Sequence, residues 1–248
     1  MFLRLRCRPS RRTIDARERR LVVIIFQDRR MAGRALGLLV RDAIAEQPHA
    51  ADAIVLGLPR GGVPVAFEVA RLLDLPLDVC VVRKLGVPGE EELAMGAVAS
   101  GGVVVVQTDV AHAYRIRQET LDAVVARERL EVERREAAYR DGRPPPRVEG
   151  RMVILVDDGL ATGATMTAAA RAMRSLARRV VVAVPVAAPS TCEALRREVD
   201  LILCLEAPES FHAVGQFYRN FDQTTDAEVR ALLAHARGDA SDRPPSPR

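Results

Sequence analysis

The 248 residues are 48% hydrophobic and 28% charged, which suits one large folded domain and excludes a disordered or fibrous chain. The formal net charge is only +4, and much of the basic excess lies in the first twenty residues, so the composition argues against a general nucleic-acid surface. The longest apolar runs, such as 180–188, have the length of buried strands and fall short of the roughly 18 residues of a membrane span.

The two ends of the chain differ in composition from the domain between them. Residues 1–25 are rich in Arg but have no long apolar stretch and no small-residue cleavage site, so we expect a disordered basic leader. An organelle transit segment and an upstream start included in the reading frame are the alternatives. Residues 237–248 are polar and Pro-rich, which predicts a disordered tail. Four cysteines without metal-site spacing predict buried, reduced thiols in a cytoplasmic protein.

The domain predicted for 26–236 begins with a strand, a loop, a helix and a strand. An apolar run at 53–57 is followed by a helical period at 63–74 and a second apolar run at 77–84. Continuous apolar runs on either side of a helix predict parallel strands that are buried on both faces. We therefore predict an open, mainly parallel α/β sheet with helices on both faces, which binds its ligand at the carboxyl ends of the strands.

An insertion of about 86–148 separates this unit from the next. Residues 93–107 are predicted to form a hairpin that turns at Gly101 and Gly102. The charged stretch 110–139 predicts one helix, either solvated or facing another subunit, so a homodimer stays open. We assign this helix no chemical role.

The second unit, from 152 to 206, repeats the alternation of strands and helices and contains the strongest chemical pattern. A strand ends in two carboxylates, Asp157 and Asp158, and a loop of small residues then enters a helix. Backbone N–H groups of such a loop bind anions, and Thr162 and Thr165 add hydroxyl donors. The carboxylates would repel a phosphate, so they should face sugar hydroxyls or Mg²⁺. A ribose 5-phosphate suits both parts of the pattern.

This stretch resembles the motif with which type I phosphoribosyltransferases bind 5-phosphoribosyl 1-pyrophosphate (PRPP). An apolar strand, two acidic residues and a loop of the form A-T-G-A-T follow one another. The resemblance implies that the acidic pair contacts the ribose hydroxyls. It also implies that the 5-phosphate is bound by the loop residues Ala161, Thr162, Gly163, Ala164 and Thr165. The layout is similar to a bacterial group of such domains with an unclear acceptor. An ordinary strand-to-helix turn with an acidic helix start is the alternative.

A second glycine-containing pattern, Arg60-Gly61-Gly62, follows the first strand and precedes a helix. It resembles the pyrophosphate loop of the same family, in which backbone amides and a basic side chain hold the leaving group. A plain glycine turn would explain these three residues alone. Their position one strand–helix–strand unit before the acidic pair favours the pyrophosphate loop.

Lys84 is the single lysine among 37 basic residues. The strand at 77–84 is predicted to end on the same rim of the sheet as Arg60. Successive strand residues point to opposite faces, so one of Arg83 and Lys84 should reach the ligand while the other packs or anchors the loop. The resemblance implies that basic residues here approach the pyrophosphate. A chance lysine on a solvated loop is the alternative.

Residues 207–222 follow the last strand and are rich in aromatic residues, so they are the candidate binding segment for the acceptor. By resemblance this segment is the hood that receives a nucleobase, and we predict that Phe211, Phe217 and Tyr218 bind substrate. An equally weighted alternative is that these rings cover the end of the core. His212 is predicted to be structural.

The resemblance implies an enzyme that transfers the 5-phosphoribosyl group of PRPP to a nitrogen acceptor and releases pyrophosphate. Asp157, Asp158, Lys84 and Arg60 would be its catalytic residues, and Gly61, Gly62 and Arg83 would join the substrate-binding set. Mg²⁺ is expected to be held by PRPP oxygens and waters, with the two acids contacting it through water at most. No membrane partner is expected, and nucleic acid is disfavoured.

Two other functions remain open at this point. The first is a module that senses PRPP or a nucleotide without catalysis, and the second is a hydrolase or phosphorylase of ribose phosphates. Two observations favour transfer chemistry. Arg60 and Lys84 are present beside the predicted phosphate loop, and no helix-turn-helix region is evident.

Overall fold

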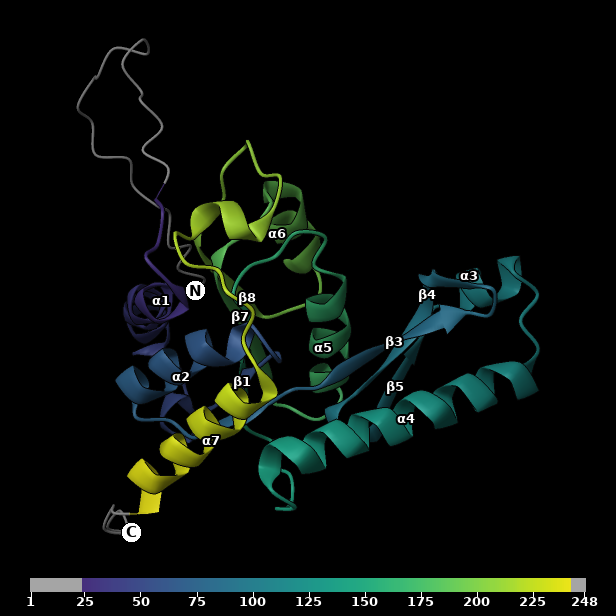
Figure 1. The fold of residues 1–248 in the computed structure, drawn as a ribbon, viewed down its shortest axis with the longest axis horizontal. Coiled ribbons are helices and arrows are strands. Elements are labelled where there is room, and N and C mark those ends of the chain that lie inside the picture. Colours follow the sequence, from purple (N-terminus) through teal and green to yellow (C-terminus); the bar gives the residue numbers. More distant parts are fainter. Residues whose placement is uncertain (1–23, 242–248) are drawn as a thin grey trace.

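The structure is a computed structural model that describes residues 24–241 (Figure 1). The predicted leader up to residue 23 and the predicted tail from residue 242 lie outside the described residues. The first described segment joins the fold at Phe26, whose backbone N–H donates to the carbonyl of Phe217 at 2.8 Å.

Five parallel strands form the central sheet in the order β2-β1-β6-β7-β8. Their bounds are β1 (Ile54–Gly57), β2 (Leu77–Val79), β6 (Met152–Val156), β7 (Arg179–Val186) and β8 (Leu201–Glu206). In the middle of the sheet, Val55 of β1 lies opposite Ile154 of β6. The predicted parallel α/β sheet is confirmed.

Helices cover both faces of this sheet (Figure 1). One face carries α1 (Arg29–Ile44), α2 (Gly62–Leu73) and α7 (Asp226–Ser241), and the other carries α5 (Ala164–Arg174) and α6 (Pro189–Leu195). Val55 and Ile154 pack with the first group, whereas Ile54 and Leu155 pack with the second. Every residue of β1 and β6 is buried, as expected for parallel strands covered on both faces.

The insertion forms an arm, residues 82–140, that projects from the central sheet (Figure 1). The arm contains β3 (Val82–Val87), β4 (Glu90–Ala99), β5 (Val103–Val106), α3 (Thr108–Ala113) and α4 (Gln118–Arg140). Its three strands pair antiparallel in the order β3-β4-β5, which confirms the predicted hairpin at Gly101 and Gly102. The pairing of β3 with β4 shifts register on both sides of Gly86.

The prediction of one continuous strand over 77–84 is wrong. β2 ends before Cys80, and β3 belongs to the antiparallel sheet of the arm. Main-chain hydrogen bonds explain the change of sheet. The N–H of Cys80 still donates to the Gly57 carbonyl of β1 at 3.0 Å, whereas the N–H of Val81 donates to Oγ of Ser100 at 2.8 Å. Two buried residues therefore separate the two sheets.

The prediction of one charged helix over 110–139 is also wrong. The chain turns between α3 and α4, and Arg115 in this turn has a left-handed φ of 51°. The N–H of Ile116 donates to the Ala111 carbonyl at 2.9 Å, and the Ile116 side chain packs against the main core. Burial of this side chain stabilises the turn, which sends α4 back along the arm sheet.

The last helix extends further than the sequence predicts. α7 continues to Ser241, past residue 237, where we expected the tail to begin. Its residues Val229, Leu232 and Leu233 are buried in the main core. Among the residues that the structure describes, no helix combines the length and the apolar character needed to cross a membrane.

Candidate functional site

The loops after β1 and β6 meet at one edge of the central sheet. The N–H of Leu58 donates to the Val156 carbonyl at 2.9 Å. A Cβ atom added at Gly61 would collide with the Asp158 carboxylate, and one added at Gly62 would lie 2.6 Å from the Val156 carbonyl oxygen. The two glycines are therefore needed for the close approach of these loops. The structure brings the predicted pyrophosphate loop directly against the predicted acidic pair.

Asp157 follows directly where β6 ends and is largely shielded from solvent. Its Oδ1 accepts the backbone N–H of Asp158 at 2.8 Å. Burial raises the pKa of Asp157 well above its ordinary value, and the neighbouring Asp158 carboxylate raises it further. A cation or a group that donates hydrogen bonds would relieve the repulsion between these two carboxylates.

Asp158 is held by two residues from distant parts of the chain. Its Oδ2 accepts Nε of Arg29 at 2.8 Å, and its backbone carbonyl accepts the hydroxyl of Tyr218 at 2.6 Å. Arg29 also donates to the carbonyl of Asp222 at 2.7 Å and lies over the ring of Phe221, 4.0 Å from its centroid. Sequence reasoning missed Arg29, because nothing distinguishes it from the many other arginines near the start of the chain.

The predicted phosphate loop is open to solvent. Four of its residues are exposed, namely Ala161, Thr162, Ala164 and Thr165. Gly163 is buried with a left-handed φ of 68° and caps the start of α5. Thr191 of α6 braces the loop, because its hydroxyl donates to the Ala161 carbonyl at 2.5 Å. Thr191 was not predicted, and no sequence pattern marks it.

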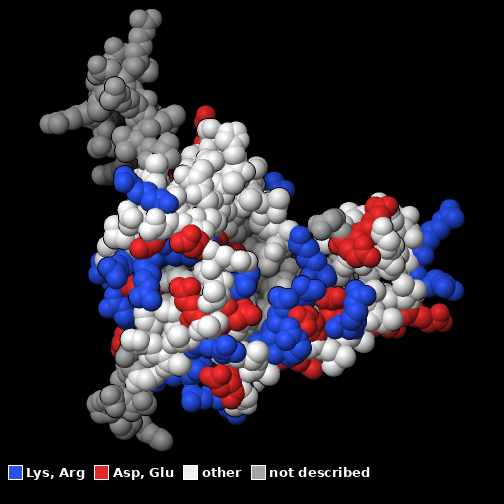
Figure 2. Space-filling view, viewed as in Figure 1, with Lys and Arg blue, Asp and Glu red and all other residues white. Residues whose placement is uncertain are grey.

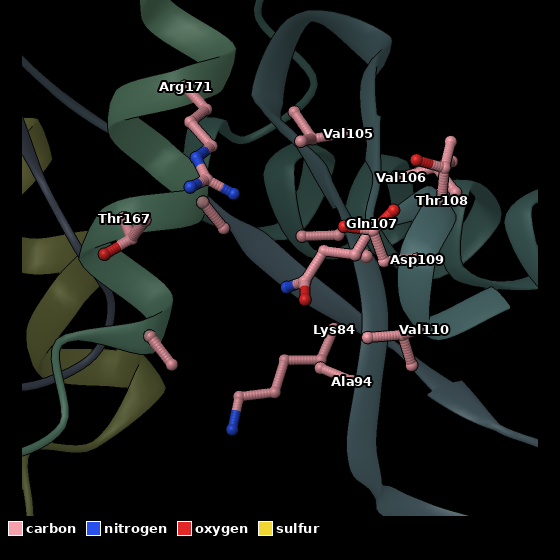
Figure 3. A pocket seen from close by; sticks show the side chains of 14 residues that line it. Lys84, Ala94, Val105, Val106, Gln107, Thr108, Asp109, Val110, Thr167 and Arg171 are labelled. Carbon is pink, nitrogen blue, oxygen red and sulfur yellow. The ribbon is translucent and has the colours of Figure 1, made fainter. Parts of the chain in front are cut away.

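Lys84 lies in the arm and faces α5. It lines a cavity of about 570 Å³ between the arm sheet and α5, together with Gln107, Ala164, Thr167 and Arg171. Figure 3 shows Lys84 and Gln107 projecting from the arm, and Arg171 projecting from α5, into the space between the arm and α5. Lys84 therefore shares a cavity with Ala164 of the predicted phosphate loop, although its strand is not part of the central sheet as predicted.

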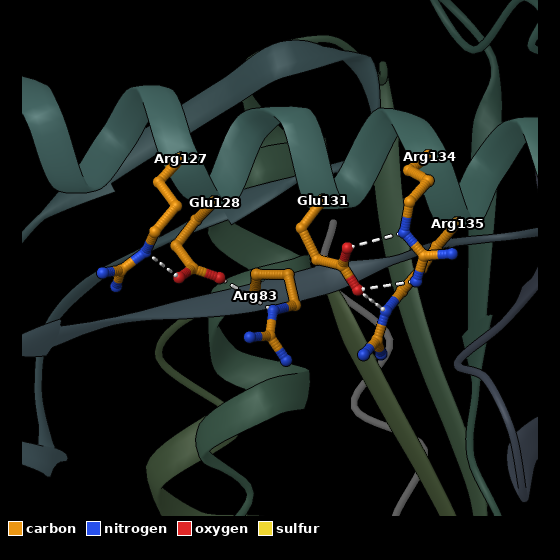
Figure 4. A network of polar contacts seen from close by, with 6 residues as sticks. All are labelled: Arg83, Arg127, Glu128, Glu131, Arg134 and Arg135. Carbon is orange, nitrogen blue, oxygen red and sulfur yellow. Dashed lines mark hydrogen bonds and ion pairs between the residues drawn. The ribbon is translucent and has the colours of Figure 1, made fainter.

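Arg83 points to the opposite face of β3, toward α4 (Figure 4). Its Nε lies 2.9 Å from Oε2 of Glu128, and Arg127 pairs with the other oxygen of the same carboxylate at 3.0 Å. Strand alternation therefore separates Arg83 from Lys84, as predicted. The structure gives Arg83 an anchoring position in the arm instead of the substrate-binding position in our set.

Arg60 is also separated from Lys84. Its exposed side chain lines a second cavity, which α4 and α7 close on the other sides with Arg135, Tyr139 and Arg230. The peptide bond between Pro59 and Arg60 is cis. Arg60 and Lys84 therefore line different cavities instead of the single rim predicted for them and the acids.

The hood aromatics mainly cover the end of the core. Phe217 is 1% exposed and packs with Phe26 in a small apolar cluster, so its predicted substrate contact is corrected to a structural position. Phe211 is partly buried and stacks on Phe217 with ring centroids 5.4 Å apart. Tyr218 is buried, and its hydroxyl supports the backbone of Asp158. Phe221, which stacks on Tyr218, is exposed.

The site combines three chemical elements around two loops. Two carboxylates lie at the end of β6, an exposed loop of backbone amides and threonine hydroxyls follows them, and a glycine loop packs against them. Within residues 24–241, no group of three or more His, Cys, Asp or Glu side chains is placed to hold a metal ion. The paired carboxylates offer hard oxygen ligands, which suit Mg²⁺ carried by a phosphorylated ligand.

The family profile and the curated relatives that match this chain carry the same description. A sequence profile of the phosphoribosyl transferase domain matches residues 34–222. Two curated proteins of Mycobacterium tuberculosis, from strains CDC 1551 and H37Rv, are each 45% identical over 216 residues, which is 87% of this chain. Their provisional names describe phosphoribosyl transferases. The aligned part is 48% of each relative, so the chain spans about half the length of the curated relatives it matches.

A solved structure has the same fold over most of both chains. The crystal structure of TT1426 from Thermus thermophilus is 44% identical in sequence and superposes with a TM-score of 0.75. The match covers 86% of this chain and 99% of that chain.

Proposed function

Since the chain belongs to the phosphoribosyl transferase family, we propose that it binds PRPP and transfers its 5-phosphoribosyl group to a nitrogen base with release of pyrophosphate. One observation carries this proposal: an exposed loop at 161–165 follows two carboxylates at the end of β6, and a glycine loop packs against those carboxylates. The three groups match the three parts of PRPP, which are the 5-phosphate, the ribose diol and the pyrophosphate.

The 5-phosphate is assigned to the loop 161–165. Backbone N–H groups at the start of α5 provide partial positive charge, and the hydroxyls of Thr162 and Thr165 can donate hydrogen bonds. The bracing contact from Thr191 keeps the loop in one conformation, which reduces the entropy lost when the phosphate binds. Lys84, which shares a cavity with Ala164, adds a charge at the border of this subsite.

The ribose hydroxyls are assigned to Asp157 and Asp158. Carboxylate oxygens accept hydrogen bonds from a vicinal diol, and their negative charge stabilises the positive charge that develops at C1 when pyrophosphate leaves. The high pKa of Asp157 is consistent with this assignment, because hydroxyl donors or a nearby cation would relieve the repulsion from Asp158.

Mg²⁺ bound to PRPP would neutralise part of the pyrophosphate charge. The two carboxylates are the residues that would contact its bound waters, and no protein ligand beyond them is required by the proposal. Arg60 is assigned to the leaving pyrophosphate, together with the backbone N–H groups of the glycine loop.

The reaction needs no protein nucleophile. The acceptor nitrogen donates its electron pair to C1 of the ribose and releases its proton to water. The bond from C1 to the pyrophosphate oxygen breaks, and that oxygen carries away the electron pair. Attack from the opposite side inverts the configuration at C1. The protein contributes position and charge: the carboxylates fix the ribose, and the basic side chains stabilise the departing anion.

One observation favours a second function, a PRPP-sensing module without catalysis. Arg29 occupies an oxygen of Asp158 that the ribose would use, and it joins α1 to the hood through Asp222. Binding of PRPP would have to compete with this ion pair, and the hood would respond to the competition.

A single assay separates these functions. The full chain is incubated with PRPP, Mg²⁺ and a panel of purines, pyrimidines and amines, and pyrophosphate release is followed beside direct binding of PRPP. Release that depends on one acceptor supports the transferase. Binding without release supports the sensor, and release without any acceptor indicates hydrolysis. The folded double variant Asp157→Asn/Asp158→Asn should lose at least ~10²-fold in kcat/KM, and near wild-type turnover would contradict the ribose assignment.

A further inference from the structure

A cavity of about 450 Å³ lies between the glycine loop, α4 and α7. Four guanidinium groups line it: those of Arg60, Arg134, Arg135 and Arg230. They come from three separate segments of the chain, so no sequence pattern predicts that they meet. The volume lies within the usual range for sites that bind small molecules.

The arginines of the cavity differ in how they are paired. Arg134 and Arg135 both pair with Glu131, at 2.8 Å and 2.7 Å, and Figure 4 shows their guanidinium groups near that carboxylate. Arg135 uses only its Nε for this contact. Within the described residues, the side chains of Arg60 and Arg230 have no hydrogen-bonded or ion-paired partner. Several N–H donors are therefore available for a ligand.

The acidic groups near the cavity do not balance this charge. Asp226 is the one carboxylate among the described lining residues, and its Oδ1 accepts the hydroxyl of Tyr139 at 2.8 Å. Burial and the hydrogen bond to Asp226 raise the pKa of Tyr139 to about 12, so its hydroxyl stays protonated and adds no negative charge. Asp226 also begins α7, whose N-terminal end carries partial positive charge. In Figure 2 the surface over α4 carries many basic side chains beside acidic ones.

We infer that this cavity binds a diphosphate group through the arginines of α4 and α7. The inference rests on the proposed function only in that Arg60 belongs to both the glycine loop and the cavity. Guanidinium groups bind phosphate oxygens in pairs through a rigid, planar set of donors. Arg134 already donates Nε and Nη2 to Glu131, at 2.8 Å and 3.0 Å, so three guanidinium groups from three directions are left for a ligand. Two linked phosphates offer a pair of oxygens to each of these three groups more readily than one phosphate does. A neutral or cationic ligand would leave this charge uncompensated.

The test is a calorimetric titration of inorganic pyrophosphate into the full chain in metal-free buffer. For Arg135→Gln/Arg230→Gln we expect Kd to rise at least tenfold, equivalent to ~1.4 kcal/mol. The matched control is Arg127→Gln/Arg129→Gln, which removes two charges from α4 outside the cavity and should change Kd less than twofold. Unchanged binding in the cavity variant, or equal weakening in the control, would overturn the inference.

A second variant tests the cavity in the opposite direction. Asp226→Asn removes the lining carboxylate while its amide oxygen can still accept the Tyr139 hydroxyl, so pyrophosphate should bind more tightly. Unchanged or weaker binding in this variant would contradict the inference, even if the arginine variant failed to fold. Inorganic phosphate should bind more weakly than pyrophosphate to wild type, and equal affinity for both would exclude diphosphate selectivity.

The same titration distinguishes the source of the diphosphate. With saturating PRPP present, competition identifies the pyrophosphate group of PRPP itself, whereas unchanged binding identifies a separate diphosphate. Direct binding is measured without an acceptor and without turnover. Failure of the transferase assay would therefore leave this result standing, and loss of the cavity effect would leave the transferase assignment standing.

Discussion

Asp157 and Asp158 are adjacent in the chain but have different electrostatic surroundings. Asp158 has a guanidinium partner, whereas Asp157 is shielded from solvent beside another carboxylate, which raises its pKa. A folded-state pKa above the unfolded value adds stability at low pH that is lost as the pH rises through the folded-state pKa. This loss should begin near the unfolded value of about 3.9.

We expect Asp157→Asn to be more stable than wild type at neutral pH, because asparagine cannot ionise. The difference in free energy of unfolding should be small near pH 4 and should grow as the pH rises. Urea unfolding of both proteins between pH 4 and 8 measures it. The control is Asp158→Asn, which loses the ion pair with Arg29 and should be less stable than wild type by about 1–3 kcal/mol. A loss of stability in both variants would mean that burial does not disfavour the Asp157 carboxylate.

Arg83 and Lys84 should respond differently to the same truncation. Arg83→Ala leaves the nearly buried Glu128 with only the exposed Arg127, so we expect a loss of about 1–2 kcal/mol in stability and little change in kcat. Lys84→Ala should keep its stability and lose about tenfold or more in kcat/KM, mainly through weaker PRPP binding, because its charge lies at the border of the 5-phosphate subsite and the 5-phosphate charge does not change during the reaction. Lys84→Arg should recover part of the loss. Full activity of Lys84→Ala would make the single lysine an accident of composition.

The sequence could predict that Asp157, Asp158 and the loop 161–165 lie together, because they follow one another closely at the end of one strand. Arg29 and Thr191 escaped prediction for the opposite reason. Arg29 lies 129 positions from Asp158, and Thr191 lies 30 positions from Ala161. Neither residue type is unusual in its local sequence. Contacts of this kind depend on how helices pack against the sheet, which a local pattern does not encode.

At the scale of elements, the glycine loop and the end of β6 are separated by less than the width of a side chain. We expect Gly62→Ala to displace one loop from the other, because the new Cβ would lie 2.6 Å from the Val156 carbonyl oxygen and 2.8 Å from Cα of Asp157. PRPP binding, measured by calorimetry, should fall at least tenfold. The control is Gly238→Ala in α7, where an added Cβ meets nothing within 4 Å, and alanine should raise helix stability by about 0.5–1 kcal/mol. Unchanged PRPP affinity in Gly62→Ala would show that the loops can separate without cost to the site.

The elements themselves were predictable where a single period extends over enough residues. β6, β7 and the hairpin at Gly101 were predicted correctly from continuous apolar runs and paired glycines. The division of 77–84 between two sheets could not be predicted. Cys80 and Val81 continue the apolar run and are buried, so their residue types give no sign of the change. Which sheet they join depends on Gly57 and Ser100, whose positions follow from the complete fold.

At the scale of the whole molecule, the central sheet and the arm differ in how well their strands are shielded. Every residue of β6 is buried, whereas every residue of β5 is only partly buried at the edge of its sheet. We expect amide hydrogens of β5 to exchange at least about tenfold faster than those of β6, measured by mass spectrometry at neutral pH. Similar protection in the two strands would indicate that the arm is covered in solution, for example by a second subunit.

The short crossing from β2 to β3 determines how the arm can move. Cys80 and Val81 are 0% and 1% exposed and are bonded to both sheets, so the strands provide no slack linker at the base of the arm. We therefore expect the arm to bend along its length instead of rotating where it leaves the central sheet. We expect the bend at the register shift around Gly86, where the pairing of β3 with β4 is interrupted. Lys84 precedes that shift, and a deflection of the tip would leave its ammonium group in place beside α5.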